Sequence, residues 1–195
     1  MSFFRNRLGF DASYYKARSF DQILPVIVST ATGYNSKFLN AATVDNKGVE
    51  LTLFGTPYKN GNFSWDVSIN WARNRNEVVK LFEGSENVVL ANFQGGITLN
   101  ASLGKPYGTI RGTNFVYDSA SGQPIVGSNG RYLISPTSNE VIGDPNPDWV
   151  GGINNTFKFK NLSLSFLIDA RHGGDVFSLD LYYGMGSGLY PETAG

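Results

Sequence analysis

The sequence contains no cysteine, a single histidine and no excess of charge of either sign. Without cysteine it can form neither a disulfide nor a thiolate metal site. Its 16 basic and 16 acidic residues balance, unlike the basic surface of a nucleic-acid-binding domain. Charged residues make up 16% of the chain, whereas roughly 25% is usual in soluble domains. These shortages exclude a disulfide-stapled domain and argue against a nucleic-acid-binding protein.

Long apolar runs are missing as well. No window approaches the roughly 18 apolar residues of a membrane-spanning helix, and the first ten residues lack the basic and apolar segments of a signal peptide. A membrane β-strand leaves a fainter trace, because only every second residue faces lipid. The missing helix signal therefore leaves membrane-spanning strands open.

Aromatic residues, at 14%, and 23 glycines are abundant. Apolar and polar residues alternate with a period of two, the pattern of a strand with one apolar face. The clearest case is residues 62–73, where one row holds Phe63, Trp65, Val67, Ile69 and Trp71. Residues 8–14, 49–53 and 162–171 alternate similarly, and residues 150–159 do so less regularly because Asn155 falls in the apolar row. The sequence predicts an all-β fold of about seven or eight antiparallel strands.

The connections have two lengths. Residues 56–61, with Pro57 and Asn60-Gly61, predict a compact turn, and residues 159–161 predict a second short link. Residues 17–47 and 74–148 are expected to be long and irregular, with further short strands around 88–99 and 107–117 and no amphipathic helix. Short turns at one end and long loops at the other are typical of bacterial outer-membrane barrels.

The dimensions agree with a membrane wall. From Phe63 to Trp71 the strand advances about 26 Å at about 3.3 Å per residue, and a tilt near 40° leaves roughly 20 Å of height against an apolar band of roughly 25 Å. A soluble β-sandwich alternates in the same way, so the pattern alone leaves both open. Low charge, high aromatic content and the loop asymmetry favour the membrane.

A series of short motifs adds a family resemblance. It begins with Asn6-Arg7-Leu8-Gly9-Phe10, Tyr14-Tyr15-Lys16, Asp21-Gln22-Ile23-Leu24-Pro25, Thr32-Gly33-Tyr34 and Asn40-Ala41. It continues with Asn46-Lys47-Gly48-Val49-Glu50-Leu51, Thr56-Pro57, Phe63-Ser64-Trp65-Asp66-Val67 and Asn74-Arg75-Asn76-Glu77-Val78-Val79-Lys80-Leu81. It ends with Gly104-Lys105-Pro106-Tyr107-Gly108, the stretch from Ile142 to Trp149, the strand from Leu164 to Asp169, and Gly173-Gly174. In this order the motifs resemble the C-terminal half of SusC/RagA-type TonB-dependent transporters.

The resemblance implies a partial transmembrane β-barrel with long extracellular loops, in the outer membrane of a Bacteroidetes-type cell. Members of the family take up glycans or peptides through a large barrel with an N-terminal plug, and they work with a SusD-like surface lipoprotein and the TonB complex. Residues 1–195 are expected to be a fragment of the barrel domain without the plug, cut at both ends, since the sequence finishes on Thr193-Ala194-Gly195 rather than on an aromatic strand. Gly48 is expected to relieve crowding where a loop enters a strand, and residues 144–149 are expected to form a rigid loop that feeds the next strand.

The chain offers little catalytic chemistry. His172 has Asp169 and Asp175 nearby in sequence, but no Gly-x-Ser-x-Gly motif supplies a nucleophile. Residues 118–122 resemble a calcium loop only faintly, because the alternating acidic ligands are missing, and a polar hairpin turn is the simpler interpretation. Asp144 and Asp148 are close in sequence, but Pro145 and Pro147 between them suggest that they shape a loop. We therefore expect no enzyme activity, no catalytic residue, no cofactor and no metal site.

Substrate contact is the remaining possibility for side chains in the loops. Aromatic rings stack on sugars, and five lie in or near predicted loops: Tyr34, Phe93, Tyr107, Tyr132 and Trp149. Ordinary loop packing is the simpler explanation of these rings, so the sequence leaves the substrate-binding residues unknown. The alternative function is a free-standing all-β module that binds carbohydrate at the cell surface.

Overall fold

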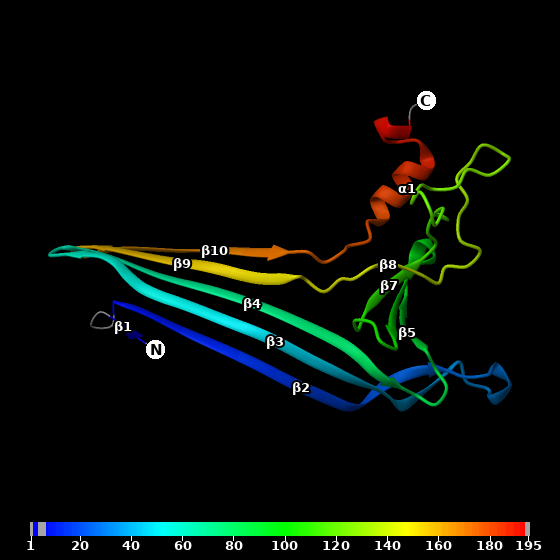
Figure 1. Ribbon diagram of the computed structural model, residues 1–195, viewed down its shortest axis with the longest axis horizontal. Helices are drawn as coiled ribbons and strands as arrows, with labels where there is room; N and C mark the ends of the chain where they lie inside the picture. The colour runs from blue at the N-terminus through cyan, green and yellow to red at the C-terminus, as the bar shows by residue number, and fades with distance from the viewer. Residues whose placement is uncertain (1, 4–6, 194–195) are drawn as a thin grey trace. The chain divides into compact units, whose positions relative to one another are not determined.

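The computed structural model describes residues 2, 3 and 7–193, and in them ten strands form two antiparallel sheets, which confirms the all-β class. The first sheet has the order β1 (Ser2–Phe3), β2 (Leu8–Ile27), β3 (Ser36–Asn60), β4 (Phe63–Leu81), β9 (Trp149–Phe159) and β10 (Leu162–His172) (Figure 1). The second has the order β5 (Asn87–Asn92), β6 (Thr98–Ser102), β7 (Thr109–Gly112) and β8 (Glu140–Gly143). The expected seven or eight strands become ten because the stretch 88–99 holds parts of two strands, β5 and β6, and because β1 and β8 were not expected. Asn6, Ala194 and Gly195, used in the sequence interpretation, lie outside the described residues.

One compact unit, which we call the strand wall, comprises the described residues of 1–19, 44–76 and 146–174. Its strands pair in a register that keeps like residues on one face: Ile69 of β4 is opposite Ile153 of β9, which is opposite Ile168 of β10. Because successive side chains of a strand point to opposite faces, this register separates an apolar face from a polar face over the whole wall.

The other unit, the loop unit, comprises residues 20–43, 77–145 and the described residues of 175–195. It holds the far ends of β2, β3 and β4, the sheet β5–β8, the helix α1 (Leu179–Ser187) and the short 3-10 turns at Thr30–Thr32, Gln94–Gly96 and Pro191–Thr193. Nearly all buried hydrophobic side chains of the described chain belong to this unit: Leu24, Ala41, Ala42, Val78, Leu81, Val88, Ile97, Ala101 and Ile110. The loop unit therefore has a conventional core.

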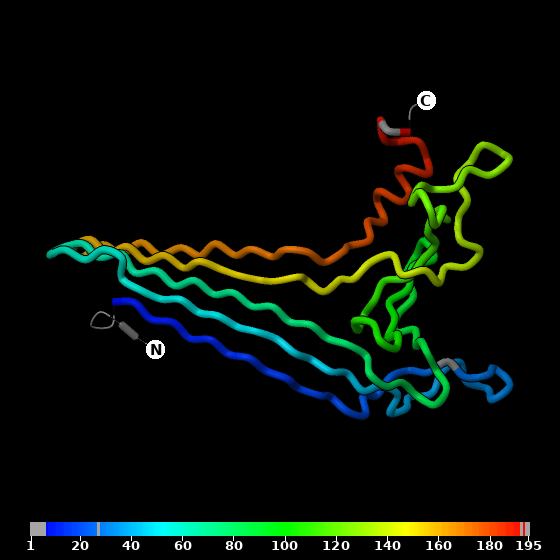
Figure 2. Tube along the Cα trace, in the orientation of Figure 1, coloured from blue at the N-terminus to red at the C-terminus, as the bar shows by residue number. Residues whose placement is uncertain are grey.

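The turns of the strand wall are tighter than expected. Residues 56–61 do not form one compact turn, because β3 continues to Asn60 and only Gly61 and Asn62 reverse the chain (Figure 2). Thr56 donates its backbone N–H to Arg7 and its hydroxyl to Asp66, which keeps this segment extended through Pro57. Between β9 and β10 only Lys160 and Asn161 turn, as expected for the short link at 159–161.

The irregular segments are shorter than expected. Within the region 17–47 only residues 28–35 lie outside strands, and within 74–148 β4 runs on to Leu81. Both strands extend beyond the alternating region because their neighbours continue beside them. No amphipathic helix was expected, and the short helix α1 depends on its caps instead: Ser178 accepts the Leu181 N–H in the first turn, and Gly188 ends the helix with a φ of 74°. None of the helices within the described ranges is long and apolar enough to cross a membrane.

Candidate functional site: the two faces of the strand wall

The apolar face of the strand wall is exposed over three adjacent strands. Of β10, Leu162, Leu164 and Ile168 keep 74%, 62% and 57% of their surface accessible. Val44 is the only buried hydrophobic residue among the described residues of this unit. A soluble sandwich would cover such a face with a second sheet. The side chains that alternate so regularly in the sequence therefore do not build a core of their own.

Aromatic rings connect the strands across the apolar face. The ring of Phe157 in β9 lies 5.7 Å from Trp65 and 6.3 Å from Phe63, both in β4, and 6.1 Å from Phe166 in β10. Each distance lies in the 4.5–7 Å range in which aromatic pairs attract. These rings form a continuous row near the short-turn end of the wall.

The polar residue that interrupted the apolar row has a partner. The indole Nε1 of Trp65 donates a hydrogen bond of 3.1 Å to the side-chain oxygen of Asn155, which is buried. Val67, directly opposite Asn155 in the register, lies on the same face. The row is therefore apolar in effect, because the amide oxygen within it is satisfied by an aromatic neighbour.

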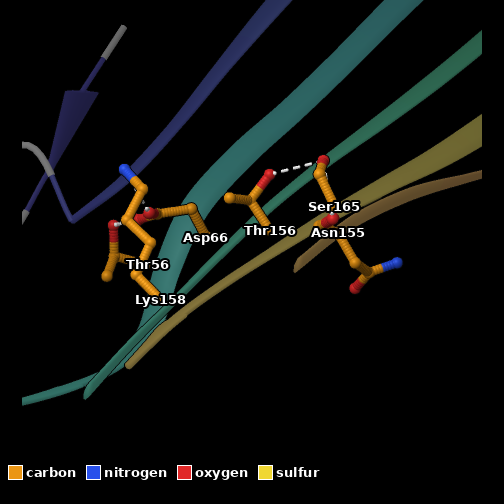
Figure 3. Close-up of polar contacts among 6 residues, drawn as sticks. All are labelled: Thr56, Asp66, Asn155, Thr156, Lys158 and Ser165. Atoms are coloured by element: carbon orange, nitrogen blue, oxygen red, sulfur yellow. Dashed lines mark hydrogen bonds and ion pairs between the residues drawn. The ribbon is translucent and has the colours of Figure 1, made fainter. Parts of the chain in front are cut away.

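The opposite face is polar and cross-linked by side chains (Figure 3). The Thr56 hydroxyl donates to Asp66 at 2.7 Å, and Lys158 lies 3.8 Å from the same carboxylate, so β3, β4 and β9 are joined. Thr156 and Ser165 lie 3.0 Å apart and join β9 to β10. An open hollow of about 540 Å³ lies further along the wall, and its polar lining includes Glu50, Asn70, Asp169 and Arg171.

A close contact fixes the first three long strands to one another. Gly48 lies within β3, not at a loop entry as expected, and a Cβ there would be 2.4 Å from the ring of Tyr15 in β2. The Tyr15 hydroxyl donates to Asn74 of β4 at 3.1 Å. Glycine is required at position 48 because the aromatic ring crosses directly over its backbone.

Charged residues replace apolar ones where the exposed face ends toward the long loops. Arg18 of β2 forms a bidentate ion pair with Asp45 of β3, and one of its bonds, from Nη2 to Oδ2, measures 2.6 Å. Arg75 of β4 binds Asp148, just before β9, at 2.6 Å. We call Lys16, Arg18, Lys47, Arg73 and Arg75, which all share this face, the cation belt. Sequence reasoning missed it, although alternation places each member in the apolar row of its strand.

The two carboxylates of the belt are held ionised. Hydrogen bonding from Arg18 lowers the pKa of Asp45 below its usual range, and the same bond raises the pKa of Arg18. Hydrogen bonding from Arg75 lowers the pKa of Asp148, helped by the charges of Arg75, His172 and Arg73. Both pairs are therefore fully charged at neutral pH.

The structure separates the residues of the improbable triad. His172 stacks on Trp149 with ring centroids 5.6 Å apart, and its Nδ1 lies 3.7 Å from Asp148. Asp169 lies three residues before His172 in β10 and so lies on the opposite, polar face. Asp175 instead accepts a hydrogen bond from the backbone N–H of Asp144 at 2.8 Å. These carboxylates therefore have separate partners and do not form a triad with His172.

The remaining candidates lie in turns. The Asp118 carboxylate accepts hydrogen bonds from the backbone of Ala120 and Ser121 and from the Ser121 hydroxyl, which lower its pKa and form a polar turn. Tyr34 and Phe93 are exposed, while burial raises the pKa of Tyr107. Tyr132 packs on Phe115 at 5.4 Å, and Trp149 stacks on His172. Tyr132 and Trp149 therefore each pack against a neighbouring ring, whereas Tyr34 and Phe93 remain exposed.

No family model matches the sequence, but individual proteins do. The whole chain aligns with TonB-dependent receptor P3 of Formosa agariphila at 27% identity and covers 21% of that protein. TonB-dependent receptor P26 of the same organism is 28% identical over 91% of the chain, which corresponds to 20% of the relative. TonB-dependent receptor SusC of Bacteroides thetaiotaomicron is 24% identical over 84% of the chain, covering 17% of that receptor. The chain thus spans about a fifth of the length of the curated relatives it matches.

Solved structures agree. A chain of the RagAB peptide importer in its closed-closed state superposes with a TM-score of 0.67 at 25% identity, over 86% of this chain and 19% of that chain. The RagAB peptide transporter gives a TM-score of 0.66 at 24% identity, over 85% and 19% of the two chains. Both the sequence and the fold are therefore similar to one part of much longer membrane receptors.

Proposed function

This chain is a portion of a SusC-type TonB-dependent receptor, and from that premise we propose that it supplies wall strands and extracellular loops to an outer-membrane nutrient importer. The observation that carries the proposal is the exposed apolar face of the strand wall. Its large side chains have no covering layer within the described unit, whereas the loop unit has a buried hydrophobic core beside its own exposed side chains. In lipid, exposing such an apolar face carries no free-energy penalty. A polar inner face is typical of the barrel interior.

The cargo we propose is a glycan or a peptide, taken up by the complete receptor rather than by this portion. RagAB, whose fold this chain shares in part, is a peptide importer. We propose a SusD-like surface lipoprotein and the TonB complex as partners of the complete receptor. The role of residues 1–195 is structural, as part of the barrel domain, and it requires no catalytic group.

The membrane placement can be tested by labelling. The chain has no cysteine, so single cysteines can be placed at Val67 and Ser68, which are neighbours in β4 on opposite faces. In the complete receptor in lipid vesicles, a fluorophore at position 67 should be quenched by lipids carrying bromine on their chains. A fluorophore at position 68 should be quenched by water-soluble iodide. Equal exposure of both positions to water would reject the wall role.

Uptake is tested in cells. Deleting the receptor gene should abolish accumulation of its cargo, and dissipating the inner-membrane proton gradient should do the same with the receptor present. Labelled oligosaccharide and peptide pools, compared side by side, assign the cargo class. Accumulation that persists without the gradient would contradict TonB-driven import.

A further inference from the structure

A hollow of about 270 Å³ lies within the loop unit, lined by residues from the far ends of β2, β3 and β4. The buried part of its lining consists of short side chains, those of Ala41, Ala42 and Thr43. The backbone oxygen of Ala41 accepts the N–H of Phe82 at 2.7 Å, which holds β3 against the end of β4. Pockets for drug-sized ligands measure roughly 300–1,000 Å³. The hollow therefore has room for one small unit of a larger ligand.

The exposed part of the lining carries polar side chains that have no partner. Asp21, Asn40, Lys80 and Glu83 line the hollow and are exposed. Their side chains form no hydrogen bond or ion pair with any residue that the structure describes. Phe82, which keeps 37% of its surface accessible, adds an aromatic ring beside them. Donors, acceptors and a ring thus all remain available to a ligand.

The backbone of Asp21 is in an unusual conformation. Its φ is 52°, and among the described residues other than glycine only Lys160 also has a positive φ. Lys160 lies in the two-residue turn between β9 and β10, where a left-handed residue is ordinary, whereas Asp21 lies inside β2. A left-handed residue inside a strand re-aims its side chain, and such strained positions gather at binding sites. The strained residue of β2 is thus the one that lines the hollow.

We propose that this hollow binds one neutral sugar unit of the cargo through Asp21, Asn40 and Lys80. Sugar hydroxyls donate and accept hydrogen bonds at once, so they need acceptors such as carboxylates beside donors such as an ammonium and an amide. The C–H face of a sugar ring packs on an aromatic ring, which Phe82 supplies. An ion of either sign would meet a like charge, because the lining carries both signs. The proposal rests on the importer function and selects a glycan from its two cargo classes.

The test is saturation-transfer NMR on the complete receptor in detergent, which detects weak ligands. The probes are the methyl glycosides of glucose, galactose, mannose, xylose and N-acetylglucosamine, with triglycine as the peptide probe. The test variants are Asp21→Gly and Lys80→Met. The matched control Lys160→Gly relieves a left-handed residue in the strand wall, and Lys37→Met removes an exposed lysine elsewhere in the loop unit.

At least one glycoside should bind to the wild type and to both controls. It should bind to each test variant at least about tenfold more weakly, because each variant loses a hydrogen bond to a charged group. Binding of no glycoside, or equal binding to the test variants and the controls, would overturn the proposal. A triglycine signal that only the test variants lose would also overturn it and would assign the hollow to peptide.

Urea unfolding separates ligand binding from a structural role of Asp21. Asp21→Gly should shift the unfolding midpoint no further than Lys160→Gly does, because glycine adopts a left-handed conformation freely. A larger decrease in Asp21→Gly would show that the carboxylate supports the fold and would contradict the proposal. If the glycosides fail while cargo uptake still requires the receptor and the proton gradient, only the sugar site is wrong. If uptake requires neither, the importer function itself fails.

Discussion

At the scale of single residues, the contact between Gly48 and Tyr15 leaves no room for a Cβ at position 48. We predict that Gly48→Ala destabilises the receptor by about 1–3 kcal/mol, because a Cβ would overlap the ring and force it away from Asn74. Tyr15→Phe removes only the hydrogen bond and should cost about 0.5–1.5 kcal/mol. Urea unfolding in detergent measures both. In a Tyr15→Ala background Gly48→Ala should be nearly neutral, and an undiminished cost there would show that the ring is not the cause.

The hydrogen bond between Trp65 and Asn155 gives a second prediction, which concerns the loss of a polar partner. Trp65→Phe should destabilise the receptor by about 1–3 kcal/mol, since the Asn155 amide would lose its partner within an apolar surface. Adding Asn155→Leu to that variant should restore most of the loss, because neither polar group then remains. The same urea titration, made on the single and double variants, measures this coupling. Additive losses would mean that the amide finds another partner, such as water.

Sequence alone predicted the two faces but not these contacts. Alternation is a local property, so the assignment of Val67 to the apolar row needed no knowledge of its neighbours. Asn155 looked like an exception because its partner lies 90 residues earlier in the chain. The requirement for glycine at position 48 likewise depends on Tyr15 in another strand. These contacts could not be predicted because they join residues that are far apart in the sequence, although the local pattern at each residue was clear.

At the scale of elements, the ion pairs of the cation belt predict a dependence on pH. The folded-state pKa values of Asp45 and Asp148 are lowered by their arginines, so each pair stabilises the fold above the ordinary carboxyl pKa of about 4. That stabilisation is lost as the pH falls through the lower folded pKa. The unfolding midpoint of the receptor should therefore decrease on acidification below about pH 4.

The variant Asp45→Asn/Asp148→Asn should reduce this acid-dependent decrease, at the expense of a lower midpoint at neutral pH. Glu83→Gln/Glu140→Gln removes two exposed carboxylates elsewhere and serves as the control. Thermal unfolding of the three proteins from pH 7 to pH 2 provides the comparison. Parallel curves for the two variants would assign the acid sensitivity to other groups.

Element boundaries were harder to predict than element type. The alternation of β4 ends near Trp71, yet the strand continues to Leu81, where Val78 and Leu81 are buried in the loop unit. Along this one strand, the apolar residues change from the exposed alternating row to side chains buried in a core. In the sequence this change looked like the end of the strand. The helix α1 was missed because its glycine-containing interior has little helical preference. Only its caps, Ser178 and Gly188, mark it as a helix.

At the scale of the whole molecule, the two units bury apolar surface in different ways. The loop unit holds a core of its own, while the strand wall leaves its large apolar side chains exposed or half-buried, with Val44 as its one buried hydrophobic residue among those described. In the described chain β10 lies at the edge of its sheet, and every one of its residues is exposed. Unpaired N–H and C=O groups at such an edge are costly in lipid and prone to association in water.

These two properties predict the behaviour of residues 1–195 expressed alone. In water the open face and the β10 edge should drive self-association, so the chain should pellet and show no cooperative unfolding. In detergent micelles it should stay dispersed with a β-type circular dichroism spectrum, as an oligomer that pairs the edge or as a rearranged small barrel. Sedimentation with and without detergent, followed by circular dichroism, measures both. A soluble monomer that unfolds cooperatively in water would mean that the apolar face is covered within the chain itself; the kinship with the receptors would remain, but the lipid-facing wall would not.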